Sequence, residues 1–150
     1  MPELPEVETV RRGLADLLPG QAIVRATVFD SPKSFPNSPT DVQQFLYGAH
    51  VTAVRRRAKV LMIDLDTRYS LVIHLKMTGQ LIFRGANSFA GGHPNDSLIG
   101  ELPDRSTRVQ IDFTDGSRLF FNDQRKFGWM KLMPTDEIEN LPFMQKVGPE

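Results

Sequence analysis

Eight short runs of strand-forming sequence constrain the fold of this 150-residue chain more than any other feature. In the run Thr107–Phe113, apolar and polar side chains alternate, which is the pattern of a strand with one buried face. Asp115-Gly116 follows it, a pair that strongly favours a hairpin turn into the next run. The strands are therefore predicted to pair mostly as antiparallel hairpins. The eight runs are Gln21–Phe29, Val51–Arg57, Lys59–Leu65, Leu71–Met77, Gln80–Phe83, Thr107–Phe113, Ser117–Phe121 and Trp129–Leu132.

Two helices are predicted outside these strands. Over Pro5–Leu18 apolar residues recur at the spacing of one helix face, and Thr40–Tyr47 is a second, short helix. Gly85–Asp104 has no clear periodicity and is predicted to be a long functional or disordered loop. The chain is thus predicted to be an α+β, mainly β protein: an antiparallel β-sandwich of about eight strands, flanked by an N-terminal helix and a second short helix. The predicted core face of the first helix consists of Val7, Val10, Leu14 and Leu17.

The composition narrows the functional class. Basic and acidic residues balance at 18 each, which argues against a nonspecific polycationic binder but leaves room for a local basic patch. The chain has no cysteine, hence no disulfide framework and no thiolate metal site. No apolar run approaches the roughly 20 residues of a membrane span, and no signal peptide precedes the fold. We expect a monomeric cytoplasmic protein.

The N-terminus offers an unusual nucleophile. Pro2 follows the initiator methionine, and removal of Met1 would expose a secondary amine. The reference pKa of an α-amine is about 7.7–8.0, against about 10.4 for lysine, so a useful fraction is neutral and able to form an iminium ion with a sugar aldehyde. Glu3 and Glu6 are candidate proton donors or acceptors beside it. Equally, a start rich in proline and glutamate is a common helix opening, so the residues alone leave both interpretations open.

Two basic features lie in the strand region. Arg55–Lys59 places four cations within five residues, which indicates either a solvated face or phosphate binding. In the run Leu71–Leu75, alternation predicts that His74 points away from the core. On its own, His74 is more simply an ordinary surface histidine.

Two apolar residues stand where loops are predicted. Met77 precedes the polar pair Thr78-Gly79, and Phe127 follows two cations, Arg125 and Lys126. Proteins that extrude a base insert apolar wedges and arginine into the emptied stack. The alternative is that these side chains fold back onto the core, where methionine is usually found.

Together these segments resemble the N-terminal domain of bacterial formamidopyrimidine-DNA glycosylase, also called 8-oxoguanine DNA glycosylase. The opening Pro2–Arg12 is similar to the signature of that family, and Leu4 separates it from endonuclease VIII relatives, which have glycine there. Arg55–Lys59 is similar to the family's basic hairpin, His74–Gly79 to its probe loop and Asn122–Gly128 to its intercalation loop. The resemblance spans essentially all 150 residues.

The resemblance implies a bifunctional repair enzyme for double-stranded DNA that contains an oxidised purine or an abasic site. The Pro2 amine would attack the sugar C1′, expel the base and form an imine, and successive β- and δ-elimination would cut both sides of the lesion. Glu3 would handle protons, Glu6 would support the site, and Lys59 would contact the lesion phosphate or base.

The resemblance also implies a DNA interface. Met77, Arg125 and Phe127 would fill the space left by the flipped base, with Arg125 facing the orphaned cytosine, and His74 would be a further DNA contact. Where the family has a phosphate-binding histidine, this chain has Ser106, and Arg108 would partly restore the positive charge. Gln124 replaces the family's usual proline in the intercalation loop, a minor change.

The C-terminal end resembles a domain boundary. Residues 1–147 correspond to the catalytic domain, and residues 148–150 to the start of a linker. In the family this linker leads to a helix–two-turn–helix region and a four-cysteine zinc finger, so zinc is expected there and no cofactor within this chain. A protein cut at this boundary is the favoured explanation over a truncated gene. We expect such a fragment to fold but to cleave lesions weakly or not at all.

Two alternatives come from other functional classes. A non-catalytic DNA-binding or interaction module would be favoured by retention of Met1, which locks the Pro2 nitrogen into an amide. A small-molecule enzyme such as a tautomerase could also use an N-terminal proline, but a small substrate needs no wedge. The sequence leaves the preferred lesion open.

Overall fold

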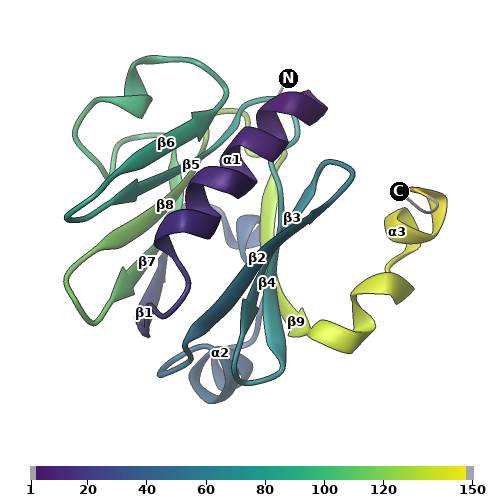
Figure 1. Ribbon diagram of the computed structural model, residues 1–150. Coiled ribbons are helices and arrows are strands. Elements are labelled where there is room, and N and C mark those ends of the chain that lie inside the picture. Colours follow the sequence, from purple (N-terminus) through teal and green to yellow (C-terminus); the bar gives the residue numbers. More distant parts are fainter. Residues whose placement is uncertain (1–2, 148–150) are drawn as a thin grey trace.

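Two antiparallel sheets pack face to face in the computed structural model, which describes residues 3–147 (Figure 1). Neighbouring strands in both sheets run antiparallel. The five-stranded sheet has the order β1 (Ile23–Val28), β7 (Thr107–Phe113), β8 (Arg118–Asp123), β5 (Gly79–Arg84) and β6 (Phe89–Gly92). The four-stranded sheet has the order β2 (Val51–Arg57), β3 (Val60–Leu65), β4 (Tyr69–His74) and β9 (Trp129–Pro134). The predicted fold class is confirmed, with nine strands in place of about eight.

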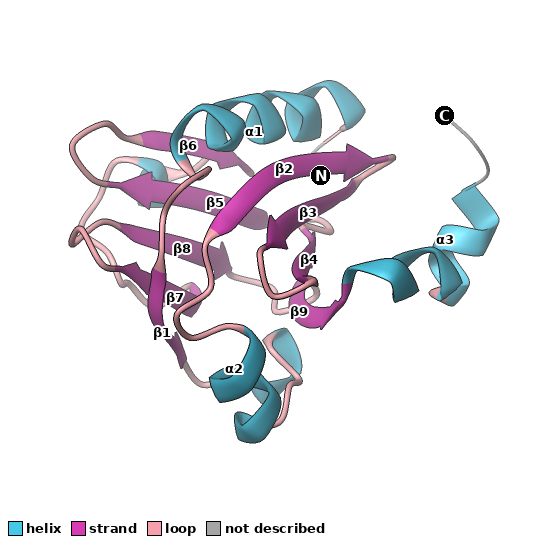
Figure 2. Cartoon of the chain, turned by 60° about the horizontal axis from the view of Figure 1, so that its bottom comes forward, coloured by secondary structure: helices cyan, strands magenta, loops and turns pink. Residues whose placement is uncertain are grey.

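Helix α1 (Leu4–Leu17) lies against β2 and β6, the edge strands of the two sheets, and so closes one side of the sandwich (Figures 1 and 2). Glu3 is the residue before its first turn, and the Glu6 carboxylate accepts the Glu3 backbone N–H at 2.9 Å. This bond satisfies one of the amides that a helix start leaves without a partner. This helix start lies beside the β2–β3 hairpin, because Lys59 of that hairpin reaches Glu3.

The core face of α1 differs from the prediction at its end. Val7, Val10 and Leu14 are buried as predicted, but Leu17 is only half-buried and Leu18, just past the helix, is fully buried. The chain leaves the helix at Leu18, whose N–H still bonds to the Leu14 carbonyl, and this change of direction turns the Leu18 side chain inward.

Strand β6 and the 3-10 helix η2 (Asp96–Leu98) occupy part of the segment predicted to be one long loop. Gly91 leaves β6 without an alternating pattern of side chains. Together with Gly13 of α1, it also allows the helix to approach this strand. A Cβ atom on Gly13 of α1 would lie 2.3 Å from the Phe89 ring, and one on Gly91 would lie 2.8 Å from Val10. Both positions therefore need glycine for the helix to pack against the sheet.

The four-stranded sheet is buried on its inner face and on part of its outer face. Its inner face joins the main core, while that part of its outer face is covered by the 3-10 helix η3 (Thr135–Asn140) and α3 (Pro142–Val147) (Figure 1). The second cluster comprises Val60, Met62, Val72, Met133, Ile138 and Met144. Val72 is thus buried although it faces away from Leu71 and Ile73, and the expectation of an exposed outer face on this strand is wrong for most of its length.

Helix α2 (Pro39–Phe45) and the 3-10 helix η1 (Pro32–Ser34) complete the fold. Ser38 accepts the Asp41 N–H at 3.2 Å and so caps α2. Helix η1 packs against β9. This contact places the proline-rich loop at one end of the four-stranded sheet. None of the helices in residues 3–147 is long and apolar enough to cross a membrane. The predicted start of the linker at residues 148–150 lies outside the described residues.

Candidate functional site

The acidic and basic groups predicted to act at the N-terminus come together at the start of α1. Lys59, in the β2–β3 hairpin, places its Nζ 3.4 Å from Glu3 Oε2, although the two residues are 56 positions apart. Glu3 and Glu6 are exposed, and Lys59 is half-buried. Pro2 itself lies outside the described residues, but its neighbour Glu3 is placed. A substrate at this corner would therefore meet a carboxylate and an ammonium group within one hydrogen-bonding site.

The arginines of the basic hairpin are ion-paired within the fold. Arg55 pairs with a carboxylate on the neighbouring strand, Arg56 and Arg57 pair with carboxylates from distant segments, and Lys59 is close to Glu3. The three pairs are Arg55 with Asp64, Arg56 with Glu8, and Arg57 with Glu139. The nitrogen–oxygen distance is 2.5 Å in the first pair and 2.9 Å in the second. These ion pairs indicate that the arginines join elements of the fold. They count against the phosphate binding that the sequence left open.

Glu8 is the centre of the largest of these ion clusters. It accepts hydrogen bonds from Arg11, Arg56 and Arg12, which hold the pKa of its carboxyl group well below the ordinary range. The side chains of Glu8 and Arg56 are only 23% and 17% exposed, so solvent screens this pair less than an open surface pair. The cluster ties α1 to β2 and thereby fixes the helix start relative to Lys59.

His74 is a half-buried residue, not the ordinary surface histidine that the sequence suggested. It ends β4 between Val60 and Trp129, and its ring centroid lies 6.0 Å from that of Trp129. Burial, with the nearby charges of Lys76 and Lys59, lowers the pKa of His74 to about 4. The imidazole is therefore neutral at pH 7, and because Nδ1 accepts the Lys76 N–H at 3.1 Å, the proton sits on Nε2.

Two loops at the same end of the sandwich carry the predicted wedge. The segment after β4 and the segment after β8 each cross from one sheet to the other, and they lie side by side because Gly79 pairs with Asp123. Met77 and Phe127 are 42% and 53% exposed. Arg125 links them: its Nη1 is 3.8 Å from Met77 Sδ, and its guanidinium carbon is 5.0 Å from the Phe127 ring centroid. The expected exposure and proximity are both present, whereas the role as a wedge stays a prediction.

Asp123 holds the two loops together, a role that was not predicted from the sequence. This carboxylate is fully buried, and one oxygen accepts the Thr78 hydroxyl and the Arg125 N–H, the latter at 3.2 Å. The other oxygen accepts the Gly128 N–H at 2.6 Å. Aspartate is almost never fully buried without partners, and here the partners come from both loops. Only the fold brings Thr78 to Asp123 across 45 residues, which is why local sequence could not identify the contact.

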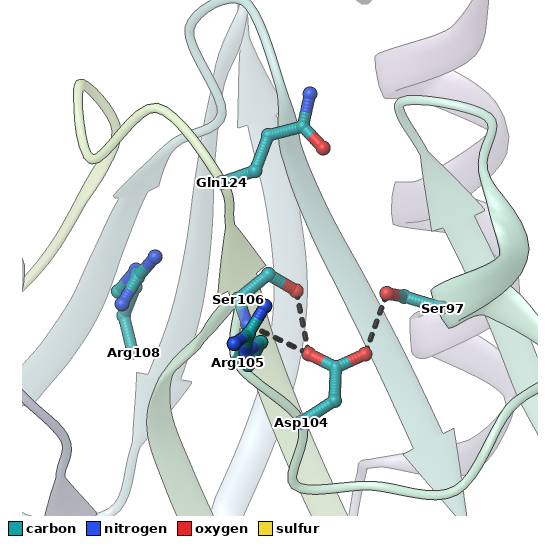
Figure 3. Close-up of a pocket in the computed structure, with 6 residues that line it drawn as sticks. All are labelled: Ser97, Asp104, Arg105, Ser106, Arg108 and Gln124. Carbon is teal, nitrogen blue, oxygen red and sulfur yellow. Dashed lines mark hydrogen bonds between the residues drawn. The ribbon is translucent and has the colours of Figure 1, made fainter.

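A cavity of about 390 Å³ lies beside these loops (Figure 3). Ser106, at the position of the family's histidine, donates its hydroxyl to Asp104 at 2.7 Å, and Ser97 donates to the other oxygen at 2.6 Å. Burial opposes ionisation of Asp104, but these hydrogen bonds outweigh it and lower its pKa. Ser106 is therefore already engaged within the protein. The cavity is lined by Ser97, Asp104, Arg105, Ser106, Arg108 and Gln124.

Arg108 is more deeply placed than a DNA contact requires. It is only 4% exposed, and its Nε donates to the Asp123 carbonyl at 2.8 Å. This bond supports the loop that carries Arg125, and direct binding of DNA by Arg108 stays a prediction. Among the described residues there is no group of three or more histidine, aspartate or glutamate side chains that could hold a metal ion.

Replacing Met77 by alanine is expected to leave stability nearly unchanged, because the side chain is exposed. The free energy of unfolding should change by no more than about 0.5 kcal/mol. Met130 is the matched control: it is fully buried, so Met130→Ala should cost about 2–5 kcal/mol. Urea unfolding of both variants checks the pair. A loss for Met77→Ala as large as that for Met130→Ala would mean that Met77 packs in the core in solution.

Comparison with known proteins gives a consistent match. A model of the formamidopyrimidine-DNA glycosylase N-terminal domain matches residues 1–130. Formamidopyrimidine-DNA glycosylases from Jannaschia sp. and Dinoroseobacter shibae are 43% identical over 152 residues and 39% identical over 150 residues. Each alignment covers 100% of this chain and 51% of the relative, so the chain spans about half the length of these proteins.

Solved structures of Lactococcus lactis Fpg are similar in fold. Its complex with DNA containing an abasic site has a TM-score of 0.78 at 27% identity, over 98% of this chain and 49% of that one. A variant bound to DNA containing Fapy-dG has a TM-score of 0.79 at 29% identity, over 99% of this chain and 49% of that one.

The fold and these matches place the chain in a family of DNA-repair glycosylases. Within that class it belongs to the formamidopyrimidine-DNA glycosylase family and comprises the N-terminal domain of that family.

Proposed function

We propose that this domain supplies the catalytic groups of a bifunctional glycosylase and AP lyase that acts on oxidised purines in double-stranded DNA. The observation that carries the proposal is the approach of Lys59 Nζ to within 3.4 Å of Glu3, the residue directly after Pro2. Glu3 directly follows Pro2 in the sequence, so this pairing of a carboxylate with an ammonium group supports the assignment of the Pro2 amine as the nucleophile. Support also comes from the related Lactococcus lactis protein, whose structures contain abasic-site DNA and Fapy-dG DNA.

The proposed chemistry begins at the Pro2 amine. The positive end of the α1 dipole disfavours a protonated amine, so the neutral, nucleophilic form is favoured. Its lone pair attacks C1′, the base leaves with the electron pair of the glycosidic bond and is protonated, and ring opening gives an iminium ion. Glu3 carries protons to and from the sugar, and Lys59 contacts the lesion phosphate or base. Glu6 fixes the helix start through its bond to the Glu3 N–H.

Elimination then breaks the DNA backbone. The iminium ion acidifies the C2′ proton, and its removal expels the 3′ phosphate in the β-elimination. A second proton loss expels the 5′ phosphate in the δ-elimination, after which hydrolysis releases the amine. Met77, Arg125 and Phe127 occupy the vacated stack, where unstacking costs a few kcal/mol and is offset by these contacts.

Borohydride trapping on an abasic-site duplex tests this proposal. Chain whose intact mass shows loss of Met1 should become covalently attached to the DNA, and peptide mapping should place the attachment on Pro2. Protein is used well above the dissociation constant, so that weak binding by the isolated domain does not limit the yield. The control is the same chain with an acetylated N-terminus, which should give no product because an amide nitrogen is not nucleophilic. Equal trapping by the acetylated chain would exclude Pro2, and absence of trapping at saturating DNA would favour a non-catalytic DNA-binding module.

A further inference from the structure

The ion pairing of the hairpin arginines raises the question of where this domain presents cations without a carboxylate partner. Lys33, Lys76 and Lys126 are all exposed. Within residues 3–147, none of the three ammonium groups forms an ion pair, in contrast to the arginines of the β2–β3 hairpin. An uncompensated cluster of cations is the electrostatic feature that binds a phosphate backbone.

These three lysines surround one cavity. It has a volume of about 580 Å³ and is also lined by Met77, Phe127, Gly128 and Trp129. Lys76 and Lys126 are the sequence neighbours of Met77 and Phe127, and Lys33 is brought to the cavity by η1, which packs on β9. Residues from three separate segments thus converge on a cavity that borders the wedge.

The backbone near the wedge is unusual in the same way at both loops. Lys76 and Lys126 have positive φ angles of 53° and 60°. Residues other than glycine seldom adopt this conformation, and where they do they cluster at functional sites. In each of the two loops, the lysine with this angle and the apolar residue after it, Met77 or Phe127, both point outward.

The part of the cavity lined by Trp129 lies two strands away from the hairpin that carries Lys59. Along this end of the four-stranded sheet, Val60 pairs with His74, and His74 pairs with Trp129. Adjacent strands are about 4.8 Å apart, so Trp129 lies roughly 10 Å from the hairpin that carries Lys59. Lys33 lies beyond β9. This span is comparable to the width of a duplex groove, about 6–12 Å.

We propose that Lys33, Lys76 and Lys126 bind backbone phosphates of the undamaged strand, opposite the flipped nucleotide. The proposal rests on the proposed function, because the Glu3–Lys59 corner defines the side of the damaged strand. Met77 and Phe127 enter the stack between the two sites, and the lysine cavity holds the complementary backbone against them. Such a contact fixes the register of the duplex on the wedge and carries no base specificity.

The salt dependence of binding tests the proposal. Binding of the chain to a duplex with a tetrahydrofuran abasic-site analogue is followed by fluorescence anisotropy between 50 and 200 mM salt. Each phosphate contact contributes about 0.9 to the slope of log K against log salt, which is roughly a 3.5-fold change in affinity over this range. Lys33→Gln should lower the slope by about 0.9, and the triple Lys33→Gln, Lys76→Gln, Lys126→Gln variant by about 2.7.

Lys131→Gln is the charge-matched control. Lys131 lies on β9 too, but it lines a different cavity, with Asp41 and Glu137. Its removal changes the net charge equally and should leave the slope within error of the unchanged chain. An equal decrease for Lys131→Gln and Lys33→Gln would show a general field effect and overturn the proposal.

Neutral methylphosphonates, placed one at a time, identify the strand. Substitution of the contacted phosphate in the undamaged strand should weaken DNA binding by the chain without mutations. It should not weaken binding by Lys33→Gln, because that variant has already lost the contact with this phosphate. Loss of this coupling, or the same coupling in the damaged strand, would overturn the assignment. If the proposed function were wrong, the result would differ: borohydride trapping would be absent, while the salt dependence of DNA binding would still change when the lysines are replaced.

Discussion

Replacing Asp123 by alanine is expected to lower the free energy of unfolding by about 2–5 kcal/mol. The change leaves the Gly128 N–H and the Thr78 hydroxyl without their acceptor inside the protein, and each buried unsatisfied group costs about 1–3 kcal/mol. Urea unfolding measures the loss. Hydrogen exchange should in addition show faster exchange of the Arg125 and Gly128 amides, because both donate to this carboxylate.

Asp115→Ala is the matched control for Asp123→Ala. Asp115 also accepts the N–H of the residue two positions later, Ser117, at 2.9 Å, but it is exposed at a hairpin turn. Water can replace the lost acceptor there, so the expected cost is about 1 kcal/mol. Equal losses for the two variants would show that Asp123 contributes no more than a local turn contact and does not join the two loops.

Truncation of Leu14 to alanine is expected to cost about 2–5 kcal/mol of unfolding free energy. Leu14 is fully buried between α1 and the two sheets, where a cavity cannot easily collapse because both sheet edges are fixed by strand pairing. The loss should appear as a lower urea midpoint with an unchanged slope.

Leu17→Ala removes the same atoms from the same helix at a half-buried position. Its expected cost is about half that of Leu14→Ala, since only part of the side chain leaves water on folding. A larger loss for Leu17→Ala than for Leu14→Ala would mean that the helix presents a different face to the core.

A large part of the fold could be predicted because its signals are local. Alternation in Thr107–Phe113 and the Asp115-Gly116 turn predicted a hairpin that the structure contains as β7 and β8. Strand β6 could not be predicted, since its Gly91-Gly92 pair provides no alternating side chains: Gly91 is required by the approach of α1, and Gly92 by the closeness of the β5 backbone and its positive φ. The burial of Val72 was missed because the segment that covers it, η3 and α3, lies more than 60 residues further along the chain.

The candidate site divides in the same way. The sequence by itself determined the chemical groups: an N-terminal Pro2-Glu3 pair, a hairpin lysine, and exposed apolar residues beside cations in two loops. Only the tertiary structure decided which of these groups act together. The fold engaged the arginines of the densest basic run in ion pairs, and a buried Asp123 joined two loops that lie 45 residues apart. The physical reason is that charge compensation and burial depend on contacts between distant segments, which no local pattern of residues encodes.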